Sequence, residues 1–425
     1  MTEEGTTTAD FGDLTATSPI LEDVDHRVPL LWHANAPWVP TGYGTQSALF
    51  LPLIERLGDY RCAFSAFHGL KGSRLGWVAP DGQQFMVYPA TDFDNHGNDV
   101  IGAHAKHWFG GKDGLVVLLT DPWVMDARIV SRLPLIAWIP IDHDPIIPKT
   151  HHWLNASQAI PVAMSRFGQR VMQDSGHDPV HYVPHGFDPV VFRPMPREDA
   201  RKRLGIPQSA FVVGMVAANL GSPSRKCFSQ AISAMHVFQE AHPDSLLYLH
   251  TKLEHPLGEN IPSMIRTKKV KVSTSDQYAL ALGTPKGVVA MLLSAFDVLL
   301  NPSMGEGFGL TMLEAQACGT PVVSTDFSAM PEVAPVEAGN WTVGGQEIWS
   351  AFESYQIIPS VDEIVDRLEQ AYADSEDDRL GRRETVHKWA MDNYQAEYVV
   401  KEYWAPVLEA CQIDIGWRAQ QMARY

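Results

Sequence analysis

The sequence has few cysteines and no long apolar run. None of its apolar stretches reaches the roughly 18 residues that a membrane-spanning helix needs. Its four cysteines are scattered and show no metal-ligand spacing, and we expect them to be free thiols in a reducing compartment. They are Cys62, Cys227, Cys318 and Cys411.

Positive charge is also scarce. The chain has 33 Lys and Arg against 50 Asp and Glu, a formal net charge of −17. Such a surface repels nucleic-acid phosphates and anionic lipids, so we expect no nucleic-acid partner. The short basic runs Arg197–Arg203 and Lys268–Lys271 are interpreted as solvated faces. The oligomeric state is not indicated.

The first 27 residues are acidic and rich in threonine. They lack the basic start and the apolar stretch of a signal peptide. We therefore predict a flexible leader over residues 1–27 and a cytoplasmic location.

The rest of the chain has the composition of a soluble enzyme, with 45% hydrophobic and 20% charged residues. Short apolar runs that do not alternate with polar residues recur between helical patterns, which is typical of parallel sheets in α/β domains. The predicted strands are Leu30–Ala34, Cys62–Phe67, Gln84–Tyr88, Leu115–Thr120, Leu135–Pro140, Ile160–Ser165, His181–Pro184, Phe211–Ala217, Ser245–Thr251, Val270–Thr274, Val298–Pro302, Pro321–Thr325 and Trp341–Val343.

Proline marks a break between two halves. Pro189, Pro194 and Pro196 fall close together, and proline continues neither a helix nor a central strand. We place a linker around 188–198, with one Rossmann-like domain over 28–190 and a second over 198–395. Ligands of such paired domains bind in the cleft at the carboxyl ends of the strands. Three helices are predicted near the end, at Val361–Tyr372, Asp378–Asn393 and Ala396–Cys411.

The segment DVLLNPSMGEGFGLTMLEAQACGTPVVSTD predicts a buried strand, a glycine-rich loop and the helix Leu310–Cys318. Glycines allow close approach to a ligand, and a helix start attracts a diphosphate. Glu306 in the loop and Glu314 in the helix can bracket an extended ligand by accepting hydrogen bonds from hydroxyl groups. Spacing alone equally allows two surface glutamates.

This segment closely resembles the Glu-x7-Glu signature of glycosyltransferase family 4, whose members have the GT-B fold. The resemblance implies a retaining enzyme that uses a nucleoside diphosphate sugar, without a metal or other cofactor. It places the donor sugar at Glu306 and the ribose at Glu314. The implied diphosphate contacts are Phe308, Gly309, Leu310 and Thr311. It also implies that a C-terminal helix, about 396–425, crosses back to complete the first domain.

A second polar loop follows the strand Phe211–Ala217 and ends in Arg225 and Lys226. A cationic pair at a helix start suits a diphosphate leaving group, although it is also compatible with a solvated pair. Lys226 matches a lysine of the family. The family arginine falls on Ala218 or Asn219, so that contact is absent or is supplied by Arg225.

The first domain begins with a strand, a glycine loop and a helix. Gly42 and Gly44 in this loop resemble the family's N-terminal glycine loop, which faces the diphosphate and the acceptor. His185 and Gly186 either border the cleft or form a purely structural turn.

Asp142 and His143 directly follow the strand Leu135–Pro140. Many family members carry a histidine near this place that contacts the transferred sugar, and either residue can be its counterpart. Asp142, His143 and Asp144 are alternatively metal ligands, which the direction of neighbouring side chains at a strand end disfavours.

The predicted activity is hexosyl transfer from a UDP- or GDP-sugar to a hydroxyl of a protein, a glycan or a small molecule, with Glu306, Asp142, His143 and Lys226 as candidate catalytic residues. The alternatives are a GT-B epimerase or phosphorylase, and an inactive nucleotide-sugar-binding module. The sequence identifies neither the sugar nor the acceptor.

Overall fold

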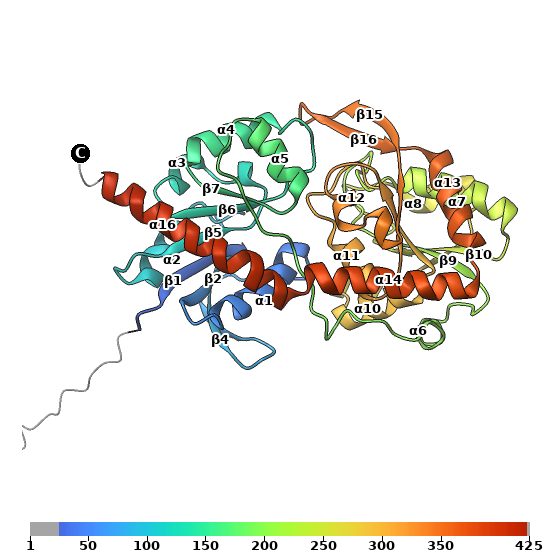
Figure 1. Ribbon diagram of the computed structural model, residues 1–425, viewed down its shortest axis with the longest axis horizontal. Helices are drawn as coiled ribbons and strands as arrows, with labels where there is room; N and C mark the ends of the chain where they lie inside the picture. Colours follow the sequence, from blue (N-terminus) through green and yellow to red (C-terminus); the bar gives the residue numbers. More distant parts are fainter. Residues whose placement is uncertain (1–24, 423–425) are drawn as a thin grey trace, which may run out of the picture.

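The structure, a computed structural model, describes residues 25–422. The predicted leader therefore lies almost wholly outside the described residues. Figure 1 shows two lobes side by side, each built around one sheet. Both sheets are parallel apart from one edge strand, which confirms the predicted α/β class.

The first lobe contains an eight-stranded sheet in the order β3-β4-β2-β1-β5-β6-β7-β8. Its central strands are buried on both faces, as their continuous apolar runs predict. Only β3, the edge strand, runs antiparallel, and it was not predicted. The strands are β1 (Val28–Asn35), β2 (Tyr60–His68), β3 (Leu75–Val78), β4 (Gln84–Tyr88), β5 (Leu115–Leu118), β6 (Leu135–Ile139), β7 (Ile160–Ala163) and β8 (His181–Tyr182).

Helices connect these strands. The helices of this lobe are α1 (Gly42–Glu55), α2 (Ile101–Phe109), the 3-10 turn η1 (Pro122–Val124), α3 (Ala127–Val130), α4 (Pro148–Ser157) and α5 (Arg166–Asp174). Thr41 caps α1 and Ser165 caps α5, each through its side-chain oxygen. These caps fix where the loops end and the helices begin at the carboxyl edge of the sheet.

The second lobe has a fully parallel six-stranded sheet in the order β11-β10-β9-β12-β13-β14. Its strands are β9 (Phe211–Val216), β10 (Ser245–His250), β11 (Val272–Thr274), β12 (Val298–Asn301), β13 (Val322–Thr325) and β14 (Trp341–Val343). Its helices are α6 (Arg197–Leu204), α7 (Phe228–Ala241), α8 (Ile261–Lys268), α9 (Gln277–Leu282), α10 (Lys286–Ala295), α11 (Leu310–Ala317), α12 (Met330–Val333), η2 (Val336–Ala338) and α13 (Val361–Ala373).

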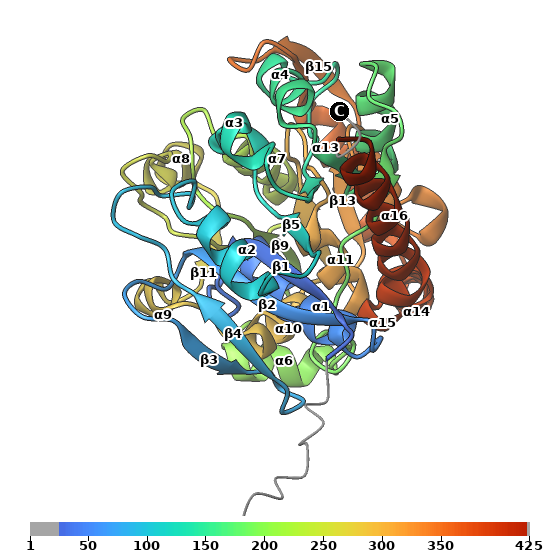
Figure 2. The same cartoon turned by 90° about the vertical axis from the view of Figure 1, so that its left-hand side faces the viewer.

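A two-stranded antiparallel hairpin extends from the second lobe. It consists of β15 (Gly345–Trp349) and β16 (Tyr355–Pro359). Figure 1 shows it above the gap between the lobes, and Figure 2 places β15 near α4 of the first lobe. No pattern in the sequence predicted this hairpin.

The C-terminal helices return to the first lobe, as the family resemblance implies. They are α14 (Glu376–Tyr394), α15 (Ala396–Val399), the π-helical turn η3 (Val400–Trp404) and α16 (Ala405–Met422), of which the last three replace the single helix predicted at Ala396–Cys411. Trp404 is fully buried and packs against Trp32 and Trp138, with ring centroids 5.3 and 5.0 Å apart. Figure 1 shows α16 lying along the first lobe.

The two lobes touch directly. Glu332 of α12 accepts hydrogen bonds from the backbone N–H of Arg166 (2.7 Å) and from the hydroxyl of Tyr182 (3.1 Å). A β-carbon added to Gly307 would lie 2.4 Å from Cβ of Pro140. The structure is therefore a closed form in which the loop after β12 lies against the loop after β6.

None of the described helices is long and apolar enough to cross a membrane. The four cysteines are buried and form no disulfide, as predicted.

Candidate functional site

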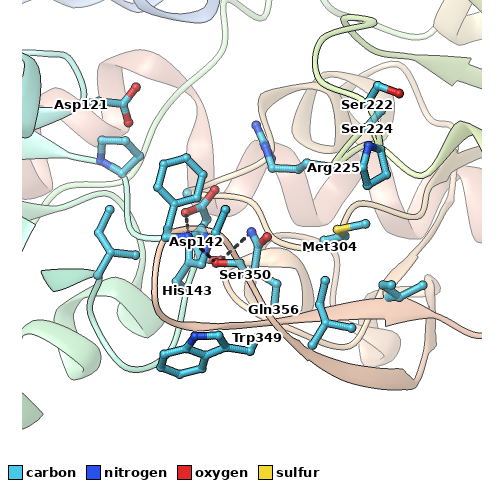
Figure 3. A pocket seen from close by; sticks show the side chains of 18 of the residues that line it. Asp121, Asp142, His143, Ser222, Ser224, Arg225, Met304, Trp349, Ser350 and Gln356 are labelled. Carbon is cyan, nitrogen blue, oxygen red and sulfur yellow. Dashed lines mark hydrogen bonds and ion pairs between the residues drawn. The ribbon is translucent and has the colours of Figure 1, made fainter. Parts of the chain in front are cut away.

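A cavity of about 840 Å³ lies between the lobes. Figure 3 shows its side chains converging from both domains, with Asp121, Asp142 and His143 on one side and Arg225 and Met304 on the other. Its floor includes Gly307 of the Glu-x7-Glu segment, and the β15–β16 hairpin forms one wall. The volume falls in the range of small-molecule sites, ~300–1,000 Å³.

Glu306 lies behind this floor in the loop between β12 and α11. It is buried and held between two cations: its Oε2 lies 3.1 Å from Nη1 of Arg225, and its Oε1 pairs with Nζ of Lys226. Burial favours the neutral carboxyl, but the two positive charges outweigh burial and lower the pKa of Glu306 to about 2. Glu306 is therefore not the surface glutamate that spacing alone allowed.

Arg225 and Lys226 precede α7. Asn219, one of the two positions on which the family arginine falls, donates its side-chain N–H groups to the backbone oxygens of Lys252 and Glu259 and so has a structural role here. The Arg225 side chain remains 42% exposed and lines the cavity. Arg225 thus supplies a cation at this edge of the cavity, and its contact with a diphosphate stays a prediction.

Helix α11 starts directly after the glycine-rich loop. Gly309 precedes it with φ of 100°, a conformation that favours glycine, and none of the described side chains caps the helix start. Leu310 and Thr311 form its first turn, and Phe308 is buried beneath it. The helix start is thus a positive end of a helix dipole without a side-chain cap.

Glu314 lies in the middle of α11 and does not line the cavity. Burial raises the pKa of Glu314 to about 7, and the charge of Lys286 only partly offsets this effect. The two glutamates of the motif therefore occupy opposite electrostatic environments.

The glycine loop of the first lobe faces the start of α11. A β-carbon on Gly42 would lie 3.2 Å from Cδ1 of Leu310, and one on Gly44 would lie 2.3 Å from the backbone oxygen of Val39. Gly42 thus permits the approach of the lobes, and Gly44 permits the turn that opens α1.

Asp142 and His143 point into the cavity side by side (Figure 3), with Oδ1 of Asp142 2.6 Å from Nδ1 of His143. Burial favours a raised pKa for Asp142, but this bond and the charge of Arg225 outweigh burial and lower the pKa. Nε2 of His143 is buried and has no hydrogen-bond partner within the described part of the chain. Asp144 instead pairs with Arg170 at 2.9 Å, so the three neighbouring residues do not converge as metal ligands.

His185 does not face the cavity. It is buried between Trp138 and Phe308, at ring-centroid distances of 4.5 and 5.1 Å, and hydrogen-bonds Gln46. Burial lowers the pKa of His185 to about 3. Of the two possibilities, the structural turn is the one observed.

Several cavity residues were not predicted from the sequence. Asp121 lies three residues after the end of β5, and its place just beyond a strand end is a signal that could have identified it. Burial and the nearby charge of Asp142 raise the pKa of Asp121 to about 6. Trp123, Trp349 and Phe352 also line the cavity, and no sequence motif marks them.

The known proteins that this chain resembles in sequence are described as glycosyltransferases. Residues 259–354 match the family model described as "Glycosyl transferases group 1". The chain is 26% identical over 267 residues to a D-inositol 3-phosphate glycosyltransferase of Segniliparus rotundus, covering 58% of this chain and 56% of the relative. A protein of the same name from Acidothermus cellulolyticus is 32% identical over 152 residues, covering 35% and 33%. The chain thus spans about half the length of these curated relatives or less.

Solved structures agree on the fold. A sucrose-phosphate synthase from Thermosynechococcus elongatus superposes with a TM-score of 0.66 at 14% identity, covering 94% of this chain and all of that one. The Anabaena protein HepE in complex with UDP-glucose gives 0.65 at 16% identity, covering 90% and 100%. The chain therefore has the GT-B fold and resembles family 4 glycosyltransferases, as the sequence predicts, and these comparisons support a glycosyltransferase enzyme.

Proposed function

We propose that this chain, with its GT-B fold and its resemblance to family 4 glycosyltransferases, transfers a sugar from a nucleoside diphosphate sugar to an acceptor hydroxyl with retention at the anomeric carbon. The observation that carries the proposal is the arrangement around α11. Glu306 with its two cations lies before the helix, the helix start has no side-chain cap, and Glu314 lies farther along the helix.

The donor would lie along this helix. Its diphosphate suits the start of α11 and the cations Arg225 and Lys226, whose two positive charges exceed the single negative charge of Glu306. Its ribose hydroxyls can donate to Glu314, and the transferred sugar can donate to Glu306, which stays ionised at any physiological pH. A UDP-sugar complex of HepE, a protein of the same fold, supports a donor of this class.

Asp142 and His143 would contact the transferred sugar. When His143 donates its Nδ1 proton to Asp142, Nε2 carries the lone pair and accepts a hydrogen bond from a sugar hydroxyl. The unpartnered Nε2 in the cavity wall supports this role. Asp142 acts as the positioning residue that holds the ring in this tautomer.

In the proposed reaction the acceptor oxygen attacks the anomeric carbon from the face that the nucleotide leaves. The bond between that carbon and the β-phosphate oxygen breaks, and the acceptor proton passes to an oxygen of the departing diphosphate. No protein carboxylate acts as a nucleophile, in contrast to paired-carboxylate glycosidases. Arg225, Lys226 and the helix start stabilise the charge that develops on the leaving group.

The proposal includes independence from metal ions, because these groups supply positive charge at the diphosphate. Activity is expected to persist in EDTA. Loss of activity in EDTA that Mg²⁺ restores would contradict this part of the proposal.

The test is a panel of UDP-, GDP- and ADP-sugars incubated with the protein and acceptors, with release of the nucleoside diphosphate as the readout. D-inositol 3-phosphate belongs in the panel because the curated relatives carry it in their names. Release that depends on both a donor and an acceptor supports transfer. Binding of donors without release in any combination points to an inactive binding module.

A further inference from the structure

The hairpin β15–β16 belongs to the second lobe but is docked on the first. Asp144 and Tyr355 exchange backbone N–H to oxygen hydrogen bonds, both at 3.3 Å. The hydroxyl of Ser354 donates to the backbone oxygen of Pro145. The hairpin therefore closes one side of the cavity, beyond the residues assigned to the donor.

Aromatic side chains line the cavity where the hairpin docks on the first lobe. Phe352, at the hairpin tip, lies 5.5 Å from the ring of His143 and 6.1 Å from the ring of Trp123. Trp349 lines the same cavity and stacks edge-on with Tyr355 at 4.9 Å. Trp349 and Phe352 remain 58% and 46% exposed although they are large apolar side chains. Exposed rings beside a cavity are available to contact a ligand.

The charges beside these rings are mainly negative. Asp121 and Asp142 face the cavity from the first lobe, and Glu259 lines it from the second (Figure 3 labels the two aspartates). Among the described lining residues, Arg225 is the one Lys or Arg, and the proposed function assigns it to the diphosphate of the donor. Carboxylates accept hydrogen bonds from hydroxyl groups but repel a phosphate.

We infer that Trp123, Trp349 and Phe352 form an acceptor subsite for an uncharged carbohydrate or polyol ring, whose hydroxyls donate to Asp121. This inference rests on the proposed function. The C–H face of a sugar ring packs flat on an aromatic ring, whose face is electronegative. The cavity, at about 840 Å³, has room for such a ring beside the transferred sugar. The subsite therefore selects neutral acceptors over phosphorylated ones.

Paired acceptors test this selectivity: myo-inositol against inositol 3-phosphate, and methyl glucoside and maltotriose against glucose 6-phosphate. Binding is measured by quenching of tryptophan fluorescence in the presence of saturating UDP, GDP or ADP, whichever binds. At least one neutral probe is expected to bind at least 10-fold more tightly than its phosphorylated counterpart. Absence of binding by every neutral probe, or tighter binding of the phosphorylated ones, overturns the inference.

Substitutions of the aromatic lining residues test where the neutral probe binds. Trp349→Ala and Phe352→Ala should each weaken binding of the neutral probe about 10-fold or more and leave nucleotide affinity unchanged. Asp121→Asn should reduce the discrimination against the phosphorylated probe. Phe93→Ala is the control, because Phe93 is an aromatic residue that is 94% exposed and does not line the cavity. Unchanged sugar binding in both aromatic variants overturns the inference.

Nucleotide titration distinguishes failure of the acceptor subsite from failure of the proposed function. If a nucleotide binds to the wild-type protein and the neutral probes do not, the acceptor subsite is wrong while the donor site stands. If no nucleoside diphosphate binds, the proposed function itself fails.

Discussion

At the residue scale, the two glutamates of the motif differ in protonation as well as in position. The pKa of Glu306 is lowered to about 2 by its cationic neighbours, after allowing for burial, whereas burial raises the pKa of Glu314 to about 7. The family resemblance implies one carboxylate for the sugar and one for the ribose. The sequence could not predict this electrostatic difference, because Arg225, Lys226 and Lys286 are distant in the chain.

The raised pKa of Glu314 predicts a pH-dependent contribution to stability. Between pH 4.5 and about 7 the folded protein keeps this proton and the unfolded chain loses it, so the free energy of unfolding falls as pH rises. Glu314→Gln removes the effect. Relative to wild type, the variant should gain roughly 1–3 kcal/mol between pH 5 and pH 8, measured by urea denaturation. The exposed Glu384→Gln is the control, and an equal pH profile in wild type and Glu314→Gln refutes the assignment.

Glu306→Gln tests the sugar contact. The amide keeps the size of the side chain and removes the charge, so turnover should fall about 10²–10³-fold while nucleotide affinity changes little. Steady-state kinetics with the active donor and direct nucleotide titration give the two quantities. If the variant retains wild-type turnover, the assignment of Glu306 as a contact of the transferred sugar is wrong.

At the element scale, the sequence predicted elements with strong local signals and missed those without. Continuous apolar runs such as Val298–Asn301 identified the buried parallel strands. The hairpin β15–β16 was missed because its strands are partly exposed and its docking depends on partners in the first lobe, near Asp144. The π-helical turn η3 was missed because a helical pattern does not distinguish π from α geometry.

The packing of Trp404, which lies in the π-helical turn η3, predicts that its removal strongly destabilises the protein. Its ring packs in the core with Trp32, Trp138 and Phe50, so Trp404→Ala should destabilise the protein by about 3–5 kcal/mol. Trp349→Ala is the matched control, because Trp349 is exposed and should change stability by less than about 0.5 kcal/mol. Equal midpoints of urea denaturation for both variants would contradict the packing of the C-terminal helices on the first lobe.

At the scale of the whole molecule, the two lobes and the crossing helices form a closed cleft. The GT-B arrangement was predicted from the alternation of strands and helices together with the family motif. The domain limits 28–190 and 198–395 remain a proposal. The contacts that close the cleft were not predictable, because they join residues such as Gly307 and Pro140 that no local pattern relates.

The contact between the lobes at Gly307 predicts that Gly307→Ala lowers turnover. The new β-carbon would meet Cβ and Cα of Pro140 at 2.4 and 3.0 Å, and neither atom lies at the end of a flexible side chain. The lobes must then separate, so turnover should fall about 10²-fold, with little change in the unfolding midpoint. Gly102→Ala is the control, because its β-carbon meets no atom within 4 Å. Small-angle scattering should show that the Gly307→Ala molecule is more open than the wild type. An unchanged scattering profile together with full activity would contradict the proposal that the closed form is the active form.

The donor site between Glu306 and Glu314 is the central claim, and calorimetric titration of UDP, GDP and ADP in the presence of EDTA tests it most directly. We predict that at least one of the three binds to the wild-type protein with a Kd in the micromolar range. Because loss of the acceptor would leave ribose hydroxyls unpaired at a cost of about 1–3 kcal/mol, Glu314→Ala should weaken that binding at least 10-fold. Binding of none of the three nucleotides, or equal affinity in wild type and a folded Glu314→Ala variant, would contradict the account.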